Sequence, residues 1–247
     1  MTELFGATRS VIKGRYALLA PGGFAAGNLP GWEKATAFVQ ISPAMGAGFC
    51  QSLITLGRDA EGRGNTGALE YFVYVVEGSG ALTVDEKKHR FEVGNFAYVP
   101  PGKDIFFQGS VTPMKLLVLQ KKYVPLAGAA RPQAVFGLDR EVKAQPLAGN
   151  ADIKKQALLP EGPGFDLAVN LLTYPPGAAL PAVETHYMEH GILMLKGQGL
   201  QRLESDHYPV QAGDVIWAAP YCPQWFVAVG KVPAVCLVYQ DVNRDPI

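Results

Sequence analysis

Cysteine is scarce in this chain, with only Cys50, Cys222 and Cys236 among 247 residues. An odd number of widely spaced cysteines does not make a disulfide framework, so we expect free thiols in a reducing compartment. Cys222 and Cys236 also have no histidine partner apart from the histidines considered below as metal ligands, which argues against a thiol nucleophile.

An excess of charge of either sign is also missing. Lys and Arg together number 22, as do Asp and Glu, and no basic run occurs. A charge balance of this kind does not attract nucleic acid or an anionic membrane, so neither partner is expected. No apolar run approaches the roughly 18 to 20 residues of a membrane span, and the first residues carry charges where a signal peptide needs an apolar core. We therefore expect a cytoplasmic protein with a small-molecule partner.

Long amphipathic helices are the third absence. The chain instead has 28 glycines and 19 prolines, which separate short runs such as "YFVYVVEG" and "HGILMLKG". Runs of this length, rich in β-branched and aromatic residues and bounded by Gly and Pro, are typical of strands. The sequence predicts a nearly all-β protein.

What the chain does contain is an internal repeat. Displaced by 119 positions, "FEVGNFAYVPPGKDIFF" from position 91 lies over "VQAGDVIWAAPYCPQWF" from position 210 without a gap. Chance rarely keeps several glycines and prolines in register, so two copies of one β-module are predicted. The residues that keep this register are Gly78, Gly80, Gly94 and Pro101, which meet Gly197, Gly199, Gly213 and Pro220.

Strands and tight turns that alternate in this way close naturally into a small barrel or jelly roll. We expect an N-terminal module, with an N-terminal arm, over residues 1–130 and a C-terminal module over residues 145–247. The stretch 128–150 is the expected linker. The first 60 residues are expected to supply strands that complete the barrels or join them.

The stretch "ETHYMEHG" is the candidate for chemistry. In a strand, Glu184, His186 and His190 share a face because side chains alternate with period two, and Gln224 follows the Pro-containing turn where the next strand enters the barrel. Two nitrogens and two oxygens suit a divalent first-row metal. A lone strand histidine is usually structural, but burial of two histidines and a glutamate without partners is costly. A helical pair at His186 and His190 is disfavoured by Gly191 and the β-type run that follows.

The first copy of the module lacks these ligands. Its equivalent positions are Asn65, Gly67, Tyr71 and Ile105, and none of these is a strong metal ligand. We therefore expect the N-terminal module to be a metal-free structural partner of the C-terminal one.

These features resemble the cupin superfamily, whose motifs are H-x-H…E…G and G…P…H. Here Glu184 takes the place of the first His, His190 that of the Glu, and Gln224 that of the last His. This exchanged pattern, with "GRYALLAPGG", "GFDLAVNLLTYPPGA" and "DVNRDPI", resembles the bicupin (S)-ureidoglycine aminohydrolases, also called glyoxylate-induced proteins of allantoin degradation. The resemblance implies manganese at the four positions. It also implies hydrolytic release of ammonia from ureidoglycine, giving ureidoglycolate, with the metal as Lewis acid.

Three positions depart from that family. It has tyrosine at the places of Gln201 and Cys236 and lysine at the place of Gln240, and there these side chains help to hold the substrate. Replacing the lysine by glutamine deletes a charge-assisted hydrogen bond of roughly 1.5 to 3 kcal/mol. The sequence therefore predicts weaker handling of ureidoglycine, or preference for a related molecule without its carboxylate, and a gain when Lys is restored at position 240.

Two alternatives stay open on the sequence alone. One is another metal-cupin enzyme, a dioxygenase or isomerase, because two histidines with a carboxylate also fit a redox iron site. The other is a non-catalytic binding bicupin, against which the retained ligands argue. In either case edge strands and the N-terminal arm favour assembly into a homo-oligomer.

Overall fold

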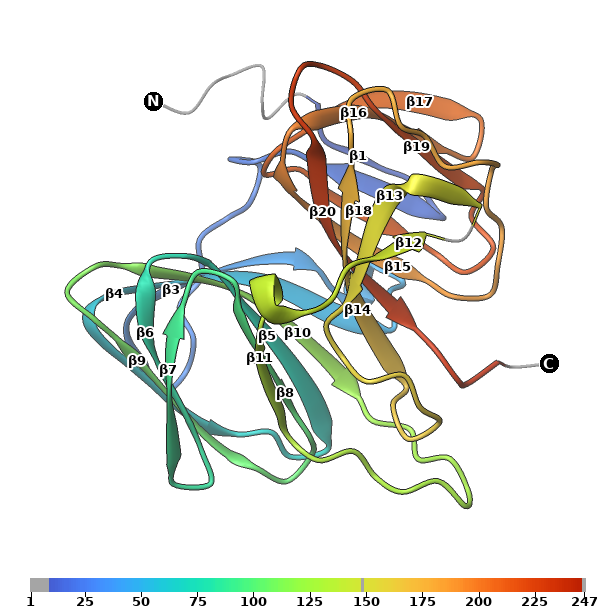
Figure 1. The fold of residues 1–247 in the computed structure, drawn as a ribbon. Coiled ribbons are helices and arrows are strands. Elements are labelled where there is room, and N and C mark those ends of the chain that lie inside the picture. Colours follow the sequence, from blue (N-terminus) through green and yellow to red (C-terminus); the bar gives the residue numbers. More distant parts are fainter. Residues whose placement is uncertain (1–8, 148, 246–247) are drawn as a thin grey trace. The chain divides into compact units, whose positions relative to one another are not determined.

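The computed structural model describes residues 9–147 and 149–245, which form strands and two single-turn 3-10 helices (Figure 1). The predicted all-β class is confirmed. No helix in the described residues is long and apolar enough to cross a membrane. The elements are β1 (Val11–Ile12), β2 (Tyr16–Leu19), β3 (Trp32–Ile41), η1 (Pro43–Met45), β4 (Phe49–Asn65), β5 (Leu69–Glu77), β6 (Ser79–Val84), β7 (Lys87–Glu92), β8 (Asn95–Val99), β9 (Asp104–Gly109), β10 (Met114–Lys122), β11 (Val135–Leu138), η2 (Asp139–Glu141), β12 (Gln145–Leu147), β13 (Asn150–Ala157), β14 (Leu167–Tyr174), β15 (His190–Lys196), β16 (Gln198–Leu203), β17 (Asp206–Gln211), β18 (Val215–Ala218), β19 (Gln224–Ala228) and β20 (Ala234–Asp241).

The chain divides into two compact units. Unit 1 takes the described residues of 1–23, 45–47 and 142–247, and unit 2 takes 24–44 and 48–141. The expected boundary differs at the N-terminal arm, because β1 and β2 join unit 1, where β2 pairs with β18. All four residues of β2 are buried, so pairing there covers an edge of β18 that would otherwise be open.

The internal repeat appears as two sets of six strands. The 119-residue displacement carries β6 onto β16 and β7 onto β17 with identical bounds. The turn glycines Gly78 and Gly197 have φ of 75° and 74°. A Cβ would lie 1.9 Å from the Pro113 carbonyl oxygen at the first position and 2.5 Å from that of Pro233 at the second. Both the left-handed backbone and the close approach therefore require glycine.

Unit 2 is one twisted sheet around an apolar core. The strand order is β11-β8-β5-β10-β4-β9-β6-β7, and β3 pairs with β4. Leu82, Ile105 and Phe107 fill its interior and are at most 5% exposed. The interior of this unit is thus packed with hydrocarbon.

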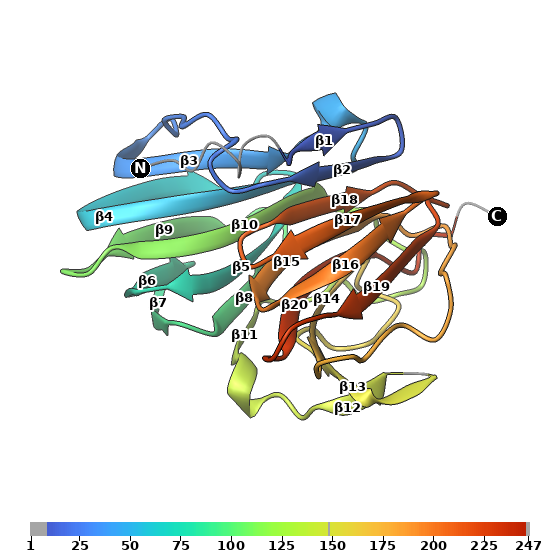
Figure 2. The same ribbon diagram turned by 90° about the horizontal axis from the view of Figure 1, so that it is seen from above.

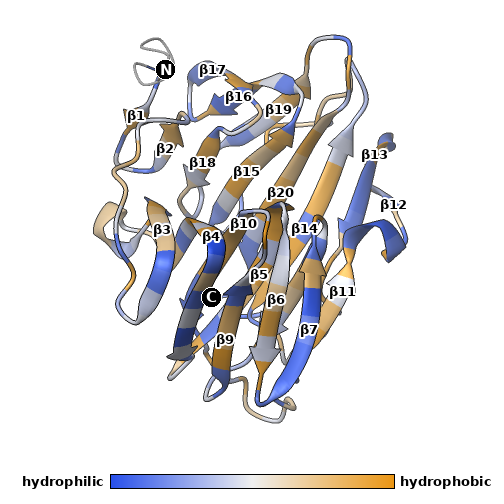
Figure 3. Cartoon of the chain, turned by 90° about the vertical axis from the view of Figure 1, so that its left-hand side faces the viewer, coloured by the Kyte–Doolittle hydropathy of each residue, from blue (hydrophilic) through white to orange (hydrophobic). Residues whose placement is uncertain are grey.

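Unit 1 contains two sheets. The larger has the order β1-β2-β18-β15-β20-β14-β13-β12, and the smaller has the order β17-β16-β19 (Figure 2). Its core includes Tyr16 and Leu18 of the N-terminal arm together with Ile192, Ile216 and Phe226. Of the strands that carry this core, β15 and β20 are largely hydrophobic, whereas β13 is largely hydrophilic (Figure 3). The arm is therefore part of the core of unit 1.

An ion pair ties the arm to unit 1. Arg9 Nη1 and Nη2 each donate to one carboxylate oxygen of Asp214 at 2.7 Å, and Asp214 is fully buried while the Arg9 side chain is 27% exposed. The Gln211 backbone N–H also donates to this carboxylate at 2.8 Å. Removal of the guanidinium would leave a buried charge without its counter-ion, which is costly.

We expect Arg9→Ala to lower the free energy of unfolding by about 2 to 3 kcal/mol, less than for a fully buried pair because Arg9 is partly hydrated. Chemical denaturation measures this. The matched control is Arg15→Ala, which breaks a surface pair with Glu204 and should cost less than about 1 kcal/mol. If both substitutions lowered the free energy of unfolding equally, the Arg9–Asp214 pair would not be the contact that stabilises the arm.

Candidate metal centre and its pocket

A cavity of about 120 Å³ lies within unit 1, between its two sheets. Apolar side chains such as Leu172, Tyr174 and Phe226 form part of its wall. This volume is well below the roughly 300 to 1,000 Å³ of drug-sized sites, so the cavity suits a small metabolite. Its polar lining includes Asn170, Glu184, His190, Gln201, Gln224 and Gln240.

The predicted strand over residues 184–190 is only partly present. His190 begins β15, but His186 lies in an irregular segment, and Glu184 makes only an isolated bridge with Gln224. In that bridge the Glu184 N–H donates to the Gln224 carbonyl at 2.8 Å, and the Gln224 N–H donates back at 2.9 Å. The shared strand face was therefore the wrong reason for grouping these residues. A loop and a bridge bring them together instead.

His190 is buried between two glutamine amides. Gln224 Nε2 lies 3.0 Å from its Nδ1, and Gln240 Nε2 lies 3.0 Å from its Nε2. A neutral imidazole has one donor and one acceptor, so one of these two amides must present its oxygen. Burial, assisted by nearby His186, lowers the pKa of His190 to about 3. The ring is therefore neutral, which is the form that binds a metal.

His186 stands beside this ring. The ring centroids of His186 and His190 are 4.8 Å apart, and His186 Nδ1 is buried without a hydrogen-bond partner in the described structure. Burial raises the pKa of the Glu184 carboxyl, and His186 offsets part of that rise. A buried nitrogen without a partner next to a carboxyl and a second imidazole fits the needs of a divalent cation.

The side chains of Glu184, His186, His190 and Gln224 do not form a closed coordination shell in this structure. Across the described part of the chain, no group of three or more His, Cys, Asp and Glu side chains is arranged to hold a metal ion. His190 Nδ1 is instead occupied by the Gln224 amide. A cation bound here would replace that hydrogen bond, and Gln224 would turn its oxygen toward the ion.

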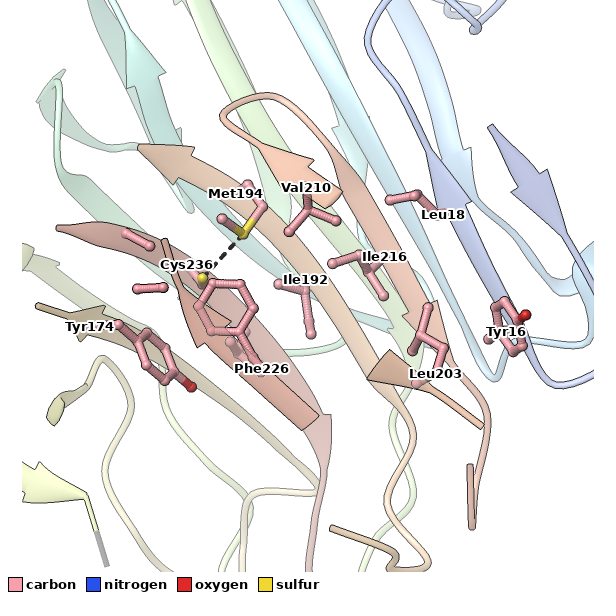
Figure 4. Close-up of a cluster of buried hydrophobic side chains, with 14 of the residues drawn as sticks. Tyr16, Leu18, Tyr174, Ile192, Met194, Leu203, Val210, Ile216, Phe226 and Cys236 are labelled. Atoms are coloured by element: carbon pink, nitrogen blue, oxygen red, sulfur yellow. Dashed lines mark hydrogen bonds between the residues drawn. The ribbon is translucent and has the colours of Figure 1, made fainter. Parts of the chain in front are cut away.

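The three expected substrate residues all line the cavity. Gln201 is 3% exposed and donates from Nε2 to the Arg202 carbonyl at 3.1 Å. Cys236 Sγ lies 3.3 Å from Met194 Sδ (Figure 4). Burial raises the pKa of this thiol to about 12, so it is protonated at neutral pH and cannot act as a thiolate nucleophile.

Two further cavity residues were not predicted from the sequence. Asn170, 4% exposed, donates from Nδ2 to Gln240 Oε1 at 3.2 Å. Lys155 of β13 also lines the cavity. Asn170 could have been recognised from the sequence, because it is a single asparagine within the apolar run "LAVNLLTY". Lys155 could not have been recognised from its neighbours in the sequence, because it reaches the cavity through the pairing of β13 with β14.

The equivalent positions of unit 2 are filled differently. Tyr71 of β5 stands opposite Gln120 there, as His190 stands opposite Gln240 in unit 1. Leu82 and Ile105 occupy the positions of Gln201 and Gln224 and are 0% and 5% exposed. This packing supports the expectation that the N-terminal module holds no metal.

Comparison with known proteins agrees with this architecture. A family model described as a cupin domain matches residues 170–239. The chain is 34% identical to the (S)-ureidoglycine aminohydrolase of Arabidopsis thaliana over 100% of the chain and 82% of that protein. It is also 34% identical to the (S)-ureidoglycine aminohydrolase of Escherichia coli over 97% of the chain and 93% of that protein. The crystal structure of protein Ylba from E. coli superposes with a TM-score of 0.87 at 29% identity, over 100% of this chain and 99% of that one.

We expect His186→Ala to lower metal affinity by more than the roughly 10- to 100-fold that loss of an outer-shell partner costs. Elemental analysis of purified protein should show one divalent ion per native chain and a strongly reduced content in the variant. Tyr71→Ala, which changes the equivalent of His190 in unit 2, should leave the stoichiometry at one. Two ions per native chain, or metal retained after His186 and His190 are both changed to Ala, would refute the site.

Proposed function

The chain belongs to the (S)-ureidoglycine aminohydrolase family, and from that premise we propose that it releases ammonia from ureidoglycine to give ureidoglycolate in purine degradation. The observation that carries this proposal is the small cavity of unit 1, which Glu184, His190 and Gln224 line, with the His186 ring 4.8 Å from the buried His190 ring. A cavity of this size admits a substrate of a few heavy atoms. Its wall offers amide donors and acceptors that match a ureido group.

We propose manganese as the resident ion, held by Glu184, His186, His190 and Gln224. When bound, the ion supplies Lewis-acid polarisation of the substrate. The side chains of the protein position the substrate. The hydrogen-bonded amides of Asn170 and Gln240 fix one polar wall, and the apolar side chains of Leu172, Tyr174 and Phe226 limit access of bulk water. Such positioning of a small substrate supplies a large part of the rate of many enzymes.

A second candidate is a metal-cupin enzyme with another reaction, such as a dioxygenase or isomerase. The observation that favours it is the change of three cavity residues, Gln201, Cys236 and Gln240, relative to the pattern of the family. A non-catalytic binding role fits less well. The interior of unit 2 is filled with apolar side chains, and a purely structural unit 1 would have no need to keep a polar cavity in its place. Oxygen uptake separates the dioxygenase from the hydrolase.

Two broader properties belong to the same proposal. Balanced charge and unpaired thiols support a cytoplasmic location. The edge strands of the larger sheet of unit 1, β1 and β12, offer backbone groups for pairing with a second copy, which supports a homo-oligomer.

We expect the manganese-loaded protein to release ammonia from freshly generated (S)-ureidoglycine, and His190→Ala to reduce that release to the uncatalysed rate. His207→Ala, an exposed histidine of β17 outside the cavity lining, should retain native activity. Coupled ammonia detection with an oxygen electrode in parallel provides the measurement. Oxygen consumption without ammonia release would favour the second candidate and refute the first.

A further inference from the structure

We propose that Lys155 holds the carboxylate of the substrate, with the amides of Asn170 and Gln240 as neutral neighbours. Lys155 thereby does from β13 what the lysine that the family has at the place of Gln240 would do from β20. This inference rests on the proposed function to the extent that ureidoglycine carries a carboxylate. It names a residue that determines specificity at the same cavity.

Sheet register places Lys155 on the cavity side of β13. Lys155 stands opposite Leu172 of β14, Leu172 opposite Cys236 of β20, and Cys236 opposite Met194 of β15. Directly paired residues point to the same face of a sheet. Lys155 therefore shares the face of Cys236, whereas its neighbour Lys154 points the other way and is exposed.

Lys155 is the one cationic side chain among the described residues that line the cavity. Together with Asn170 and Gln240 it also lines a second cavity of unit 1, of about 290 Å³. These three side chains therefore mark the place where the two cavities adjoin. An anion in the cavity of about 120 Å³ therefore meets one cation and two amides in the same wall as His190.

Contacts between these side chains continue toward the candidate metal ligands. Asn170 Nδ2 lies 3.2 Å from Gln240 Oε1, and Gln240 Nε2 lies 3.0 Å from His190 Nε2. A ureido acid has a neutral ureido end and an anionic carboxylate end. The structure thus suits a ligand whose ureido end faces His190 and whose carboxylate end faces Lys155.

The ammonium group of Lys155 has only a weak partner, which such a ligand can replace. Its ion pair with Glu161 is long, 3.5 Å, and the Glu161 side chain is 81% exposed. Exposed pairs of this kind contribute only about 0 to 1 kcal/mol, so a carboxylate held in the cavity can displace Glu161 at little cost. The charge-assisted hydrogen bond from Lys155 to a carboxylate inside the cavity is less hydrated than the exposed pair with Glu161, and it is therefore the stronger of the two.

The test uses ureidoacetate, a ureido acid without the amine that would leave, and its neutral analogue ureidoacetamide. Calorimetry on the manganese-loaded protein measures both dissociation constants. Loss of one charge-assisted hydrogen bond of roughly 1.5 to 3 kcal/mol predicts that Lys155→Met weakens ureidoacetate binding by about 10- to 150-fold. Ureidoacetamide binding should stay unchanged, as should the metal content.

Three further variants refine the result. Lys154→Met, the adjacent lysine on the opposite face, should bind both ligands as the native protein does. Lys155→Arg should keep most of the affinity for ureidoacetate, because the charge is retained. Gln240→Lys in the Lys155→Met background should restore tight binding, because it returns a cation to the same cavity from β20.

Several outcomes would overturn the assignment: no binding of ureidoacetate by the native protein, undiminished binding by Lys155→Met, or an equal loss for ureidoacetamide. Ammonia release from ureidoglycine is measured separately. Native ammonia release with ureidoacetate binding independent of Lys155 refutes this inference alone. Lys155-dependent binding without ammonia release refutes the proposed function alone.

Discussion

The candidate cavity depends on one constraint, the burial of the His190 imidazole between two β-sheets. A buried ring cannot stay charged without a counter-ion, and its two nitrogens need partners. Gln224 and Gln240 supply these partners to His190 from β19 and β20, each at 3.0 Å. The ring is thereby neutral and oriented, and His186, Asn170 and Glu184 take their places around it. A larger apolar side chain at either glutamine position would fill the space that these groups share.

The same strand module encloses a polar cavity in unit 1 and an apolar core in unit 2. Unit 2 places Leu82 and Ile105 where unit 1 has Gln201 and Gln224, and these leucine and isoleucine side chains are almost fully buried. Burial of apolar surface contributes about 25 cal/mol per Å², so a filled interior is the more stable arrangement. Unit 1 gives up part of that stabilisation to keep polar groups around a cavity. It also includes β1 and β2 and the ion pair between buried Asp214 and partly exposed Arg9.

Sequence reasoning reached the local features and missed the long-range ones. The repeat and its turn glycines could be predicted because Gly78 and Gly197 answer a local backbone requirement. The grouping of Glu184, His186, His190 and Gln224 as metal ligands stays a prediction, and the strand assumed for Glu184 and His186 is an irregular segment. The association of β2 with β18 depends on pairing between distant segments, and the place of Lys155 at the cavity depends on the register between the successive strands β13 and β14. No local pattern encodes such a register, since many strands of similar composition could pair.

The position of the cation also affects the electrostatics of the centre. A lysine at position 240 would place its ammonium group near His190 and therefore near any bound divalent ion. Like charges at short range in a medium of low dielectric repel strongly, and the repulsion weakens with distance and hydration. Gln240 leaves a neutral partner next to His190, and the charge is carried two strands away by Lys155, which is one-third exposed. That arrangement keeps an attraction for a carboxylate at the wall of the cavity, and it would reduce repulsion between the cation and a metal ion bound beside His190. The sheet register thus places the neutral amide of Gln240 and the ammonium group of Lys155 at separate points of the cavity wall. This spacing suits a ligand with one neutral end and one anionic end.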